Sequence, residues 1–160
     1  MCFILYAGTS DPIPPREWRD VAPDISVQPL SERERPVARH FSKSRVQYIG
    51  STSHCGCDFP HVIFQSGGWP WFDDGEVDDK REDSERFNRE GLVALLRQIE
   101  EPTVELYGVW DGDYDAPAIR EEIYLGAILE RDFRFKEKGF YTVTLRRGEP
   151  MRKGTRREEK

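Results

Sequence analysis

One long amphipathic helix pattern among short apolar segments most strongly restricts the folds open to this chain. Within residues 80–100, apolar side chains recur at i, i+3, i+4 and i+7, which places them on one face of an α-helix. These side chains are Leu92, Leu95, Leu96 and Ile99. Acidic residues at the start of the segment suit the positive end of the helix dipole, and Pro102 ends the pattern. We therefore expect one long helix that buries its apolar face against a sheet.

Five short segments have the alternating or continuous apolar patterns that are typical of β-strands. They cover residues 2–7, 25–29, 45–50, 103–110 and 139–145. Together with the long helix, these strands predict a single α+β domain over residues 1–145 with a mixed β-sheet.

One or two short helices are expected in addition. The first covers residues 32–41, where Ser31 and Glu34 have the spacing of a capping box. Pro36 fits this helix only in its first turn. Residues 121–129 fit either a helix or a strand.

Composition and cysteine number indicate the general class of protein. A chain of 160 residues suggests one domain, and its 12% aromatic residues allow a packed core although only 37% of residues are hydrophobic. No apolar run is long enough to cross a bilayer, and the N-terminal segment lacks the features of a signal peptide. Three cysteines, an odd number, argue against a secreted disulfide scaffold. We expect a cytoplasmic protein whose thiols are free, metal-bound or redox-active.

The charge is unevenly distributed along the chain. The formal net charge is −6, but residues 146–160 contain seven basic and three acidic residues, which leaves the other 145 residues at −10. An acidic body disfavours the phosphate contacts of nucleic-acid binding. We expect a basic, flexible C-terminal tail over residues 146–160, and neither nucleic acid nor a membrane as a partner.

A cysteine pair spaced by one glycine follows the third predicted strand. In the sequence Cys55-Gly56-Cys57, preceded by His54, two soft thiolates and an imidazole can bind Zn²⁺ or Cu(I). Cys2 supplies a third sulfur if the first and third strands are adjacent and antiparallel, whereas in a parallel pair it lies at the opposite end of the sheet. We therefore predict a soft-metal site, with zinc as its ion, formed by Cys2, His54, Cys55 and Cys57.

Two further interpretations of this cluster remain open. His40 and His61 are additional candidate ligands. In the simpler interpretation, Cys2 is a small buried apolar side chain and the Cys-Gly-Cys sequence is a tightly packed turn.

Thiol chemistry is an alternative use of the cysteines. A disulfide between Cys55 and Cys57 closes a very small ring, and strained disulfides are labile and oxidising. Removal of Met1 would make Cys2 an N-terminal nucleophile with its own α-amino group as the base. Class II glutamine amidotransferases use such a cysteine and begin Met-Cys-Gly, but Phe3 replaces the glycine here.

An aromatic group lies within the irregular segment 51–79. Trp69, Trp71 and Phe72 follow two glycines, and aromatic side chains of this kind are enriched at protein interfaces. A protein-interaction module that uses this surface is therefore a second alternative function. A short strand over residues 61–64 is expected within the same segment.

Acidic residues after the fourth strand resemble a calcium-binding loop. Asp111, Asp113, Asp115 and Glu122 match its positions one, three, five and twelve. Ala116 occupies the position of the turn glycine, so we expect these carboxylates to stabilise the turn after the strand, with a divalent-cation site as the alternative.

Three blocks of sequence are similar to those of a family of small bacterial proteins without an assigned function. The blocks are the opening Met-Cys-x-x-Leu-Tyr-Ala-Gly-Thr, Tyr48–Ser51 leading into Cys55–Phe59, and Val104–Asp113. The resemblance covers residues 1–145. It implies a bacterial cytosolic protein and implies no catalytic residue.

Overall fold

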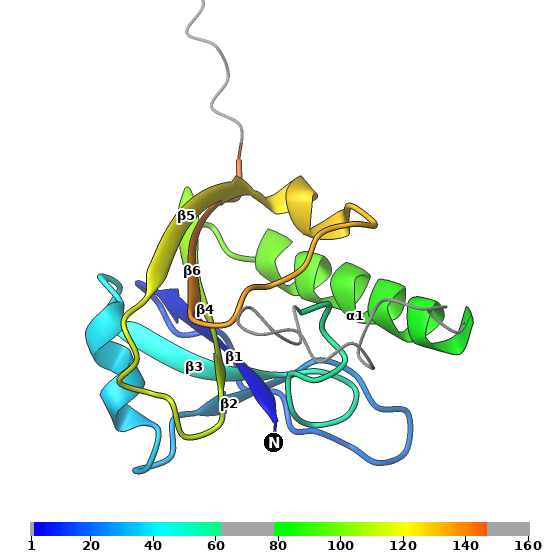
Figure 1. Cartoon of the computed structure of the whole chain (residues 1–160), viewed down its shortest axis with the longest axis horizontal. Coiled ribbons are helices and arrows are strands. Elements are labelled where there is room, and N and C mark those ends of the chain that lie inside the picture. The colour runs from blue at the N-terminus through cyan, green and yellow to red at the C-terminus, as the bar shows by residue number, and fades with distance from the viewer. Residues whose placement is uncertain (1, 62–78, 147–160) are drawn as a thin grey trace, which may run out of the picture.

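A computed structural model describes residues 2–61 and 79–146 of the chain, which form one mixed sheet covered by one long helix (Figure 1). The strands are β1 (Phe3–Thr9), β2 (Ser26–Pro29), β3 (Arg45–Gly50), β4 (Thr103–Trp110), β5 (Ile119–Tyr124) and β6 (Gly139–Thr144). The helices are α1 (Asp79–Arg97) and two short 3-10 helices, η1 (Arg35–His40) and η3 (Leu125–Leu129). The predicted α+β class, with a mixed sheet and one long helix, is confirmed.

The strand order in the sheet is β2-β3-β1-β4-β6-β5. All neighbouring pairs are antiparallel except β5 and β6, which are parallel. In the β1–β3 pair, Leu5 lies opposite Ile49 and Thr9 lies opposite Arg45. The start of β1 therefore lies beside the end of β3, which is the arrangement that a shared cysteine site requires.

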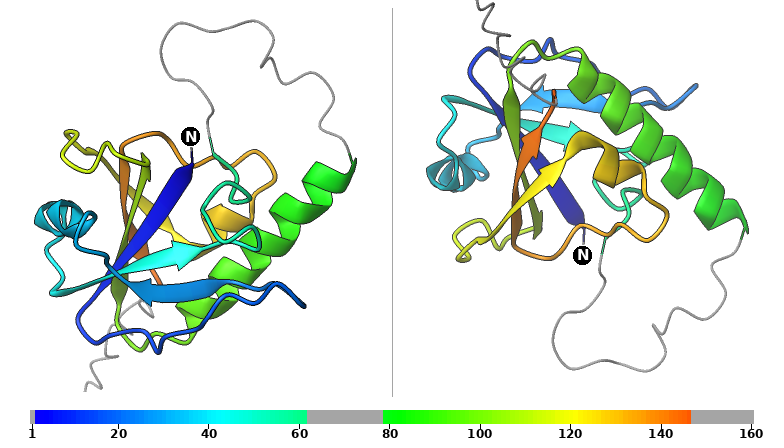
Figure 2. Two further views of the ribbon diagram at one scale, coloured as in Figure 1. Left: turned by 90° about the horizontal axis from the view of Figure 1, so that it is seen from below. Right: turned by 90° about the horizontal axis from the view of Figure 1, so that it is seen from above.

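Helix α1 lies across one face of the sheet (Figure 2). Its buried residues Leu92, Leu95 and Leu96 pack into the same apolar cluster as Phe3 and Leu5 of β1. The alternate residues of β1 face the other side, where η1 covers a second cluster. That cluster includes Ile4, Tyr6, Val37, Tyr107, Val109 and Phe140. The central strand β1 is thus buried on both faces and cannot shift without disturbing both clusters.

The structure sets the bounds and type of three predicted elements. The short helix expected over residues 32–41 is the 3-10 helix η1 over Arg35–His40, and Pro36 lies in its first turn. Residues 121–129 are divided between the two alternatives, strand up to Tyr124 and 3-10 helix after it. Helix α1 ends at Arg97 instead of residue 100. The amides of Gln98 and Ile99 donate to the carbonyl oxygens three residues earlier, those of Leu95 and Leu96, instead of four residues earlier.

Two more predictions fall largely outside the described residues. Of the strand expected at 61–64, only His61 is described, and it forms an isolated parallel bridge with Phe135. Of the basic segment 146–160, only Arg146 is described.

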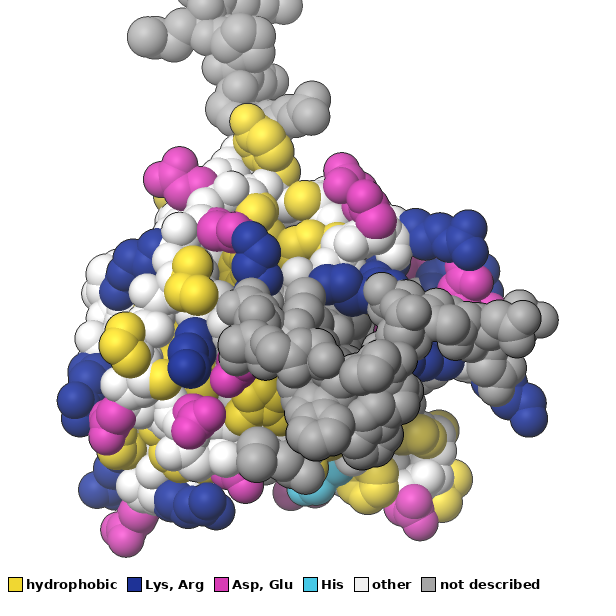
Figure 3. Space-filling model, viewed as in Figure 1, with side chains coloured by type: hydrophobic (Ala, Val, Ile, Leu, Met, Phe, Trp, Pro, Cys, Tyr) yellow, Lys and Arg dark blue, Asp and Glu magenta, His cyan; other side chains and the backbone are white. Residues whose placement is uncertain are grey.

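On the face seen in Figure 3, acidic and basic side chains are interspersed rather than segregated. Among the described helices, none has the length and apolar character that crossing a bilayer would need.

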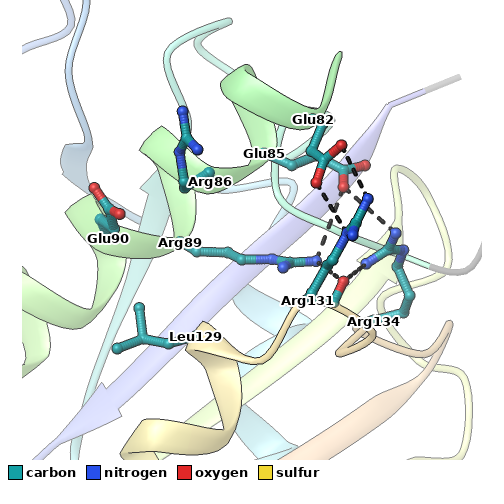
Figure 4. A pocket seen from close by; sticks show the side chains of 8 residues that line it. All are labelled: Glu82, Glu85, Arg86, Arg89, Glu90, Leu129, Arg131 and Arg134. Carbon is teal, nitrogen blue, oxygen red and sulfur yellow. Dashed lines mark hydrogen bonds and ion pairs between the residues drawn. The ribbon is translucent and has the colours of Figure 1, made fainter. Parts of the chain in front are cut away.

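A network of arginine and glutamate side chains joins α1 to the segment after η3 (Figure 4). The buried guanidinium of Arg89 donates to the carbonyl oxygens of Arg131 and Phe133 at 3.0 and 3.1 Å. Glu85, also buried, lies within 3.8 Å of Arg89 and 3.5 Å of Arg134. These groups surround a cavity of about 370 Å³. Because they are already paired with one another, we assign them a structural role.

We expect Arg89→Met to lower the free energy of unfolding by about 3 kcal/mol, because it leaves Glu85 and two carbonyl groups without their buried partner. Arg86→Met is the matched control, since Arg86 lies on the same helix in an exposed pair with Asp83. Arg86→Met should lower the free energy of unfolding by less than about 1 kcal/mol. Urea unfolding of both variants measures the difference, and equal costs would contradict the structural role.

Candidate metal centre

The three cysteines meet where the Cys-Gly-Cys loop replaces β3 as the neighbour of β1. Strand β3 ends at Gly50, and the chain then turns back so that Gly56 lies against the first residues of β1 (Figure 1). The amide of Gly56 donates a 2.8 Å hydrogen bond to the carbonyl oxygen of Phe3. Cys2 comes directly before Phe3, the first residue of β1, and its sulfur lies close to those of Cys55 and Cys57.

Only glycine fits at position 56. A Cβ atom built there would lie 2.8 Å from the carbonyl oxygen of Phe3 and 3.2 Å from the amide nitrogen of Leu5. A side chain would therefore push the loop away from the strand. The glycine between the cysteines has a packing function that the sequence analysis did not assign to it.

Hydrogen bonds within the loop hold it in a tight turn. The amide of Ser51 donates to the carbonyl oxygen of Cys55 at 2.7 Å, and the Ser51 hydroxyl donates to the same oxygen. The amide of His54 donates to the carbonyl oxygen of Ser51 at 3.0 Å. His54 has a φ of 75°, an uncommon conformation for a residue other than glycine.

Helix α1 and the loop before β2 support the turn from outside. Asn88 of α1 accepts a 2.9 Å hydrogen bond from the Thr52 amide and donates one of 3.0 Å to the Thr52 hydroxyl. The indole of Trp18 donates to the carbonyl oxygen of Thr52 at 3.0 Å. The cysteine loop is therefore held by elements that are distant from it in sequence.

The sulfur atoms of Cys2, Cys55 and Cys57 all lie within 4.8 Å of one another. A tetrahedral zinc ion with bonds of about 2.3 Å holds its sulfur ligands roughly 3.8 Å apart, so small side-chain rotations bring these atoms to ligand distance. Cys2 is exposed and the other two cysteines are half-buried, so an ion can enter from solvent. The sulfur atoms form the required group of candidate ligands.

The hydrogen bonds around Cys55 favour its thiolate form. Partial burial opposes ionisation of Cys55, but donors around its sulfur outweigh this and lower its pKa. The donors are the thiols of Cys57 and Cys2, the hydroxyl of Ser53 and the amide of Cys57, the last at 3.4 Å. Cys55 is thus poised to act as a ligand or a nucleophile.

Cys57 has the opposite tendency. Burial, together with its hydrogen bond to Cys55 and the nearby charges of Cys55 and Cys2, raises the pKa of Cys57 to about 12. A hydrogen bond from the backbone of Phe3 partly offsets these effects. The Cys55 thiol therefore loses its proton more readily than the Cys57 thiol.

The predicted histidines do not join the sulfur atoms. His54 is exposed, and its ring lies 5.1 Å from that of Trp18, outside the group of three sulfurs. Nε2 of His40 lies 2.9 Å from the carbonyl oxygen of Tyr114. His61 stacks on Phe3, and burial lowers its pKa. Of the predicted ligands, the structure brings together the three cysteines.

The acidic residues after β4 do not assemble as a calcium loop within the described part of the chain, where the three cysteines are the only group of potential metal ligands. Asp111 accepts a hydrogen bond from the Tyr114 hydroxyl and pairs with Arg33, while Asp115 pairs with Arg39 at 2.8 Å. Glu122 is exposed on β5. Asp111 and Asp115 thus stabilise the turn, as expected.

The aromatic residues Trp69, Trp71 and Phe72, proposed as a partner surface, lie outside the described residues. The sequence analysis also overlooked a groove that Arg33, Glu34 and Tyr48 line together with His54. No motif marks it, because its residues come from four separate segments of the chain.

No protein-family model matches this chain, and neither a curated protein nor a solved structure matches it significantly. The resemblance to a bacterial family stays a prediction.

Gly56→Ala should reduce the free energy of unfolding by about 2 kcal/mol, because the added methyl group meets the backbone of β1. Gly126→Ala in η3 is the control, since a Cβ atom there meets nothing within 4 Å. Urea unfolding of the two metal-free variants tests the difference. A tolerated Gly56→Ala would show that the loop does not pack on β1 as described.

Alkylation of the metal-free protein by iodoacetamide should modify Cys55 at lower pH than Cys57, because the reactive thiolate forms first where the pKa is lowered. In Cys55→Ser, Cys57 should react at lower pH than in the wild type, because an interaction that raises its pKa is removed. Peptide mass spectrometry over a pH series shows at which pH each cysteine is alkylated in the wild type and in Cys55→Ser. Earlier modification of Cys57 in the wild type would refute the proposed asymmetry.

Proposed function

We propose that this protein binds a soft metal ion, zinc, through the thiolates of Cys2, Cys55 and Cys57. The observation that carries the proposal is the approach of three sulfur atoms within 4.8 Å, although Cys2 lies more than fifty residues from the other two in sequence. Sulfur ligands favour zinc or Cu(I) over magnesium or calcium, which prefer oxygen.

The surroundings of the sulfur atoms suit bound thiolates. Amide hydrogen bonds reach the sulfurs of Cys55 and Cys57, and such bonds stabilise the negative charge of a metal-bound thiolate. Hydrogen bonds of Asn88 and Trp18 with Thr52 hold the loop beside the cysteines, and a site that is held in place loses less conformational entropy on binding.

The proposed role of the ion is structural or regulatory. An ion held by all three cysteines would link the start of β1 to the loop after β3. Because such an ion binds the folded chain and not the unfolded one, it adds stability that depends on its concentration.

Thiol redox chemistry is the second candidate, and the asymmetry between Cys55 and Cys57 favours it. A thiol with a lowered pKa next to two others can form a reversible disulfide when an oxidant such as a peroxide removes two electrons and two protons from the pair. A nucleophilic role for Cys2 stays a prediction.

Zinc binding predicts one equivalent of metal in the purified protein, measured by elemental analysis. Removing it with a chelator should increase the number of thiols that react quickly with a thiol reagent and lower the midpoint of thermal unfolding. Replacing any of the three cysteines by serine should weaken zinc binding at least tenfold.

Ser44→Ala is the control, because Ser44 is exposed just before β3 and its hydroxyl contacts the carbonyl oxygen of Ser10 rather than a cysteine. Metal-free protein with three freely reacting thiols, unchanged by added zinc, would exclude the metal site. Redox function instead predicts a disulfide after peroxide treatment and no bound metal.

A further inference from the structure

We propose that the outer edge of β5 is an interface at which two copies of this chain associate. The sheet has two outer strands, β2 and β5 (Figure 1). The outer edge of β2 is partly covered, because Arg16 forms an antiparallel bridge with Val27 through two hydrogen bonds of 3.0 Å. Among the described residues, no segment pairs with β5 on the side away from β6. An open strand edge presents amide and carbonyl groups to which another strand can bind.

The pairing with β6 determines which backbone groups of β5 point outward. The amide of Ile119 donates a 2.7 Å hydrogen bond to the carbonyl oxygen of Lys138, the residue before β6. In a parallel pair, the amide and carbonyl groups of one residue point to the same side, and successive residues alternate between the two sides. Ile119 and every second residue after it therefore face β6, whereas Arg120 and Glu122 present their backbone groups at the outer edge.

The side-chain charges favour one alignment of two antiparallel copies of β5. In a two-fold symmetric pair, residues whose backbone groups face outward lie opposite one another. Placing Arg120 or Glu122 opposite its own copy brings like charges together, and placing Glu122 opposite Tyr124 overlaps only half of the strand. The alignment that sets Arg120 of each copy opposite Glu122 of the other places opposite charges together twice. Each of these residue pairs also exchanges two backbone hydrogen bonds, so β5 is complementary to itself in this register.

The remaining side chains of β5 fit the same register. Ile119 of each copy lies opposite Ile123 of the other, and Ile123 packs against the apolar cluster that α1 covers. The isoleucines therefore extend the apolar face of the sheet across the interface. Glu121 lies opposite its own copy at the centre, but each Glu121 contacts the ammonium group of Lys136, which offsets the repulsion between the two carboxylates.

The size of this edge predicts a reversible association. Ile119 and Tyr124 of β5 are among the large apolar side chains that remain exposed in the described part of the chain, at 46% and 62%. Two strands of this length bury less surface than the roughly 1,200 Å² at the lower limit of stable complexes. We therefore expect a dimer in exchange with single chains. This interface goes beyond the proposed metal binding and does not depend on it, because the cysteines lie before β1 and after β3.

Sedimentation velocity of the full chain over a concentration series measures the association. A reducing buffer with a chelator prevents disulfides and metal ions from linking two chains. We expect the average mass to rise with concentration toward that of two chains. A mass that stays that of one chain up to about 1 mM protein would overturn the inference and leave the metal site unaffected.

Exchange of the two charges tests the register. Arg120→Glu and Glu122→Arg each place like charges opposite one another, and each variant alone should associate about tenfold more weakly than the wild type. An equimolar mixture of the two variants should associate again, because every new charge then lies opposite its counterpart on the other chain. Glu17→Arg is the control, since Glu17 is exposed beside the bridge that covers β2, at the opposite edge of the sheet.

Urea unfolding of the variants separates weaker association from lower stability. Arg120 also contacts its own chain, because its guanidinium donates a 2.9 Å hydrogen bond to the carbonyl oxygen of His40 and lies 4.3 Å from the centre of the Phe140 ring. Glu122→Arg keeps both contacts and therefore tests the register even where Arg120→Glu is destabilised.

Amide hydrogen exchange tests whether the contact lies on the backbone of β5. The amides of Arg120 and Glu122 should exchange more slowly as the protein concentration rises, whereas the amide of Ile123, which faces β6, should not change. If the chain dimerises without this protection, or if Glu122→Arg associates as tightly as the wild type, the two chains meet at another surface and the inference is wrong.

Discussion

The amide of Gly56 donates a hydrogen bond to the carbonyl oxygen of Phe3, and the geometry of the candidate site depends on this close contact. It holds the Cys-Gly-Cys loop against β1 at the point where β3 has ended. The contact requires a residue without a side chain, because two backbone atoms of β1 occupy the space of a Cβ atom. With β1 buried on both faces, the sulfur of Cys2 is presented to the loop by a strand that has little freedom to move.

Much of the fold could be predicted from sequence patterns. The apolar stripe that includes Leu92 and Leu96 indicated the helix, and the alternating segments indicated five of the six strands. Strand β5 was harder, because an edge strand with mostly exposed side chains has a weak apolar pattern. The 3-10 form of η1 depends on how Pro36 affects hydrogen bonding within one turn, which apolar periodicity does not reveal.

The candidate site could be predicted only on the condition that β1 and β3 are antiparallel neighbours. The cysteines were recognised from their chemistry, but their meeting depended on β1 and β3 being adjacent and antiparallel, and strand order is a property of the whole sheet. His54 was expected near the sulfurs because it is next to Cys55 in sequence. Its positive φ lies in a turn where the ring packs near Trp18 instead, a contact between residues far apart in the chain. The groove could not be predicted, because long-range pairing alone brings Tyr48 close to Asp111.

X-ray absorption at the zinc edge of the zinc-loaded protein counts the atoms that bind the metal and identifies them as sulfur or as lighter atoms. We predict three sulfur atoms at about 2.3 Å, together with one lighter ligand atom. Cys2→Ser should lower the count to two, which would show that the first strand contributes a ligand. A shell of nitrogen and oxygen atoms alone would contradict the proposed site, as would a sulfur count that Cys2→Ser leaves unchanged.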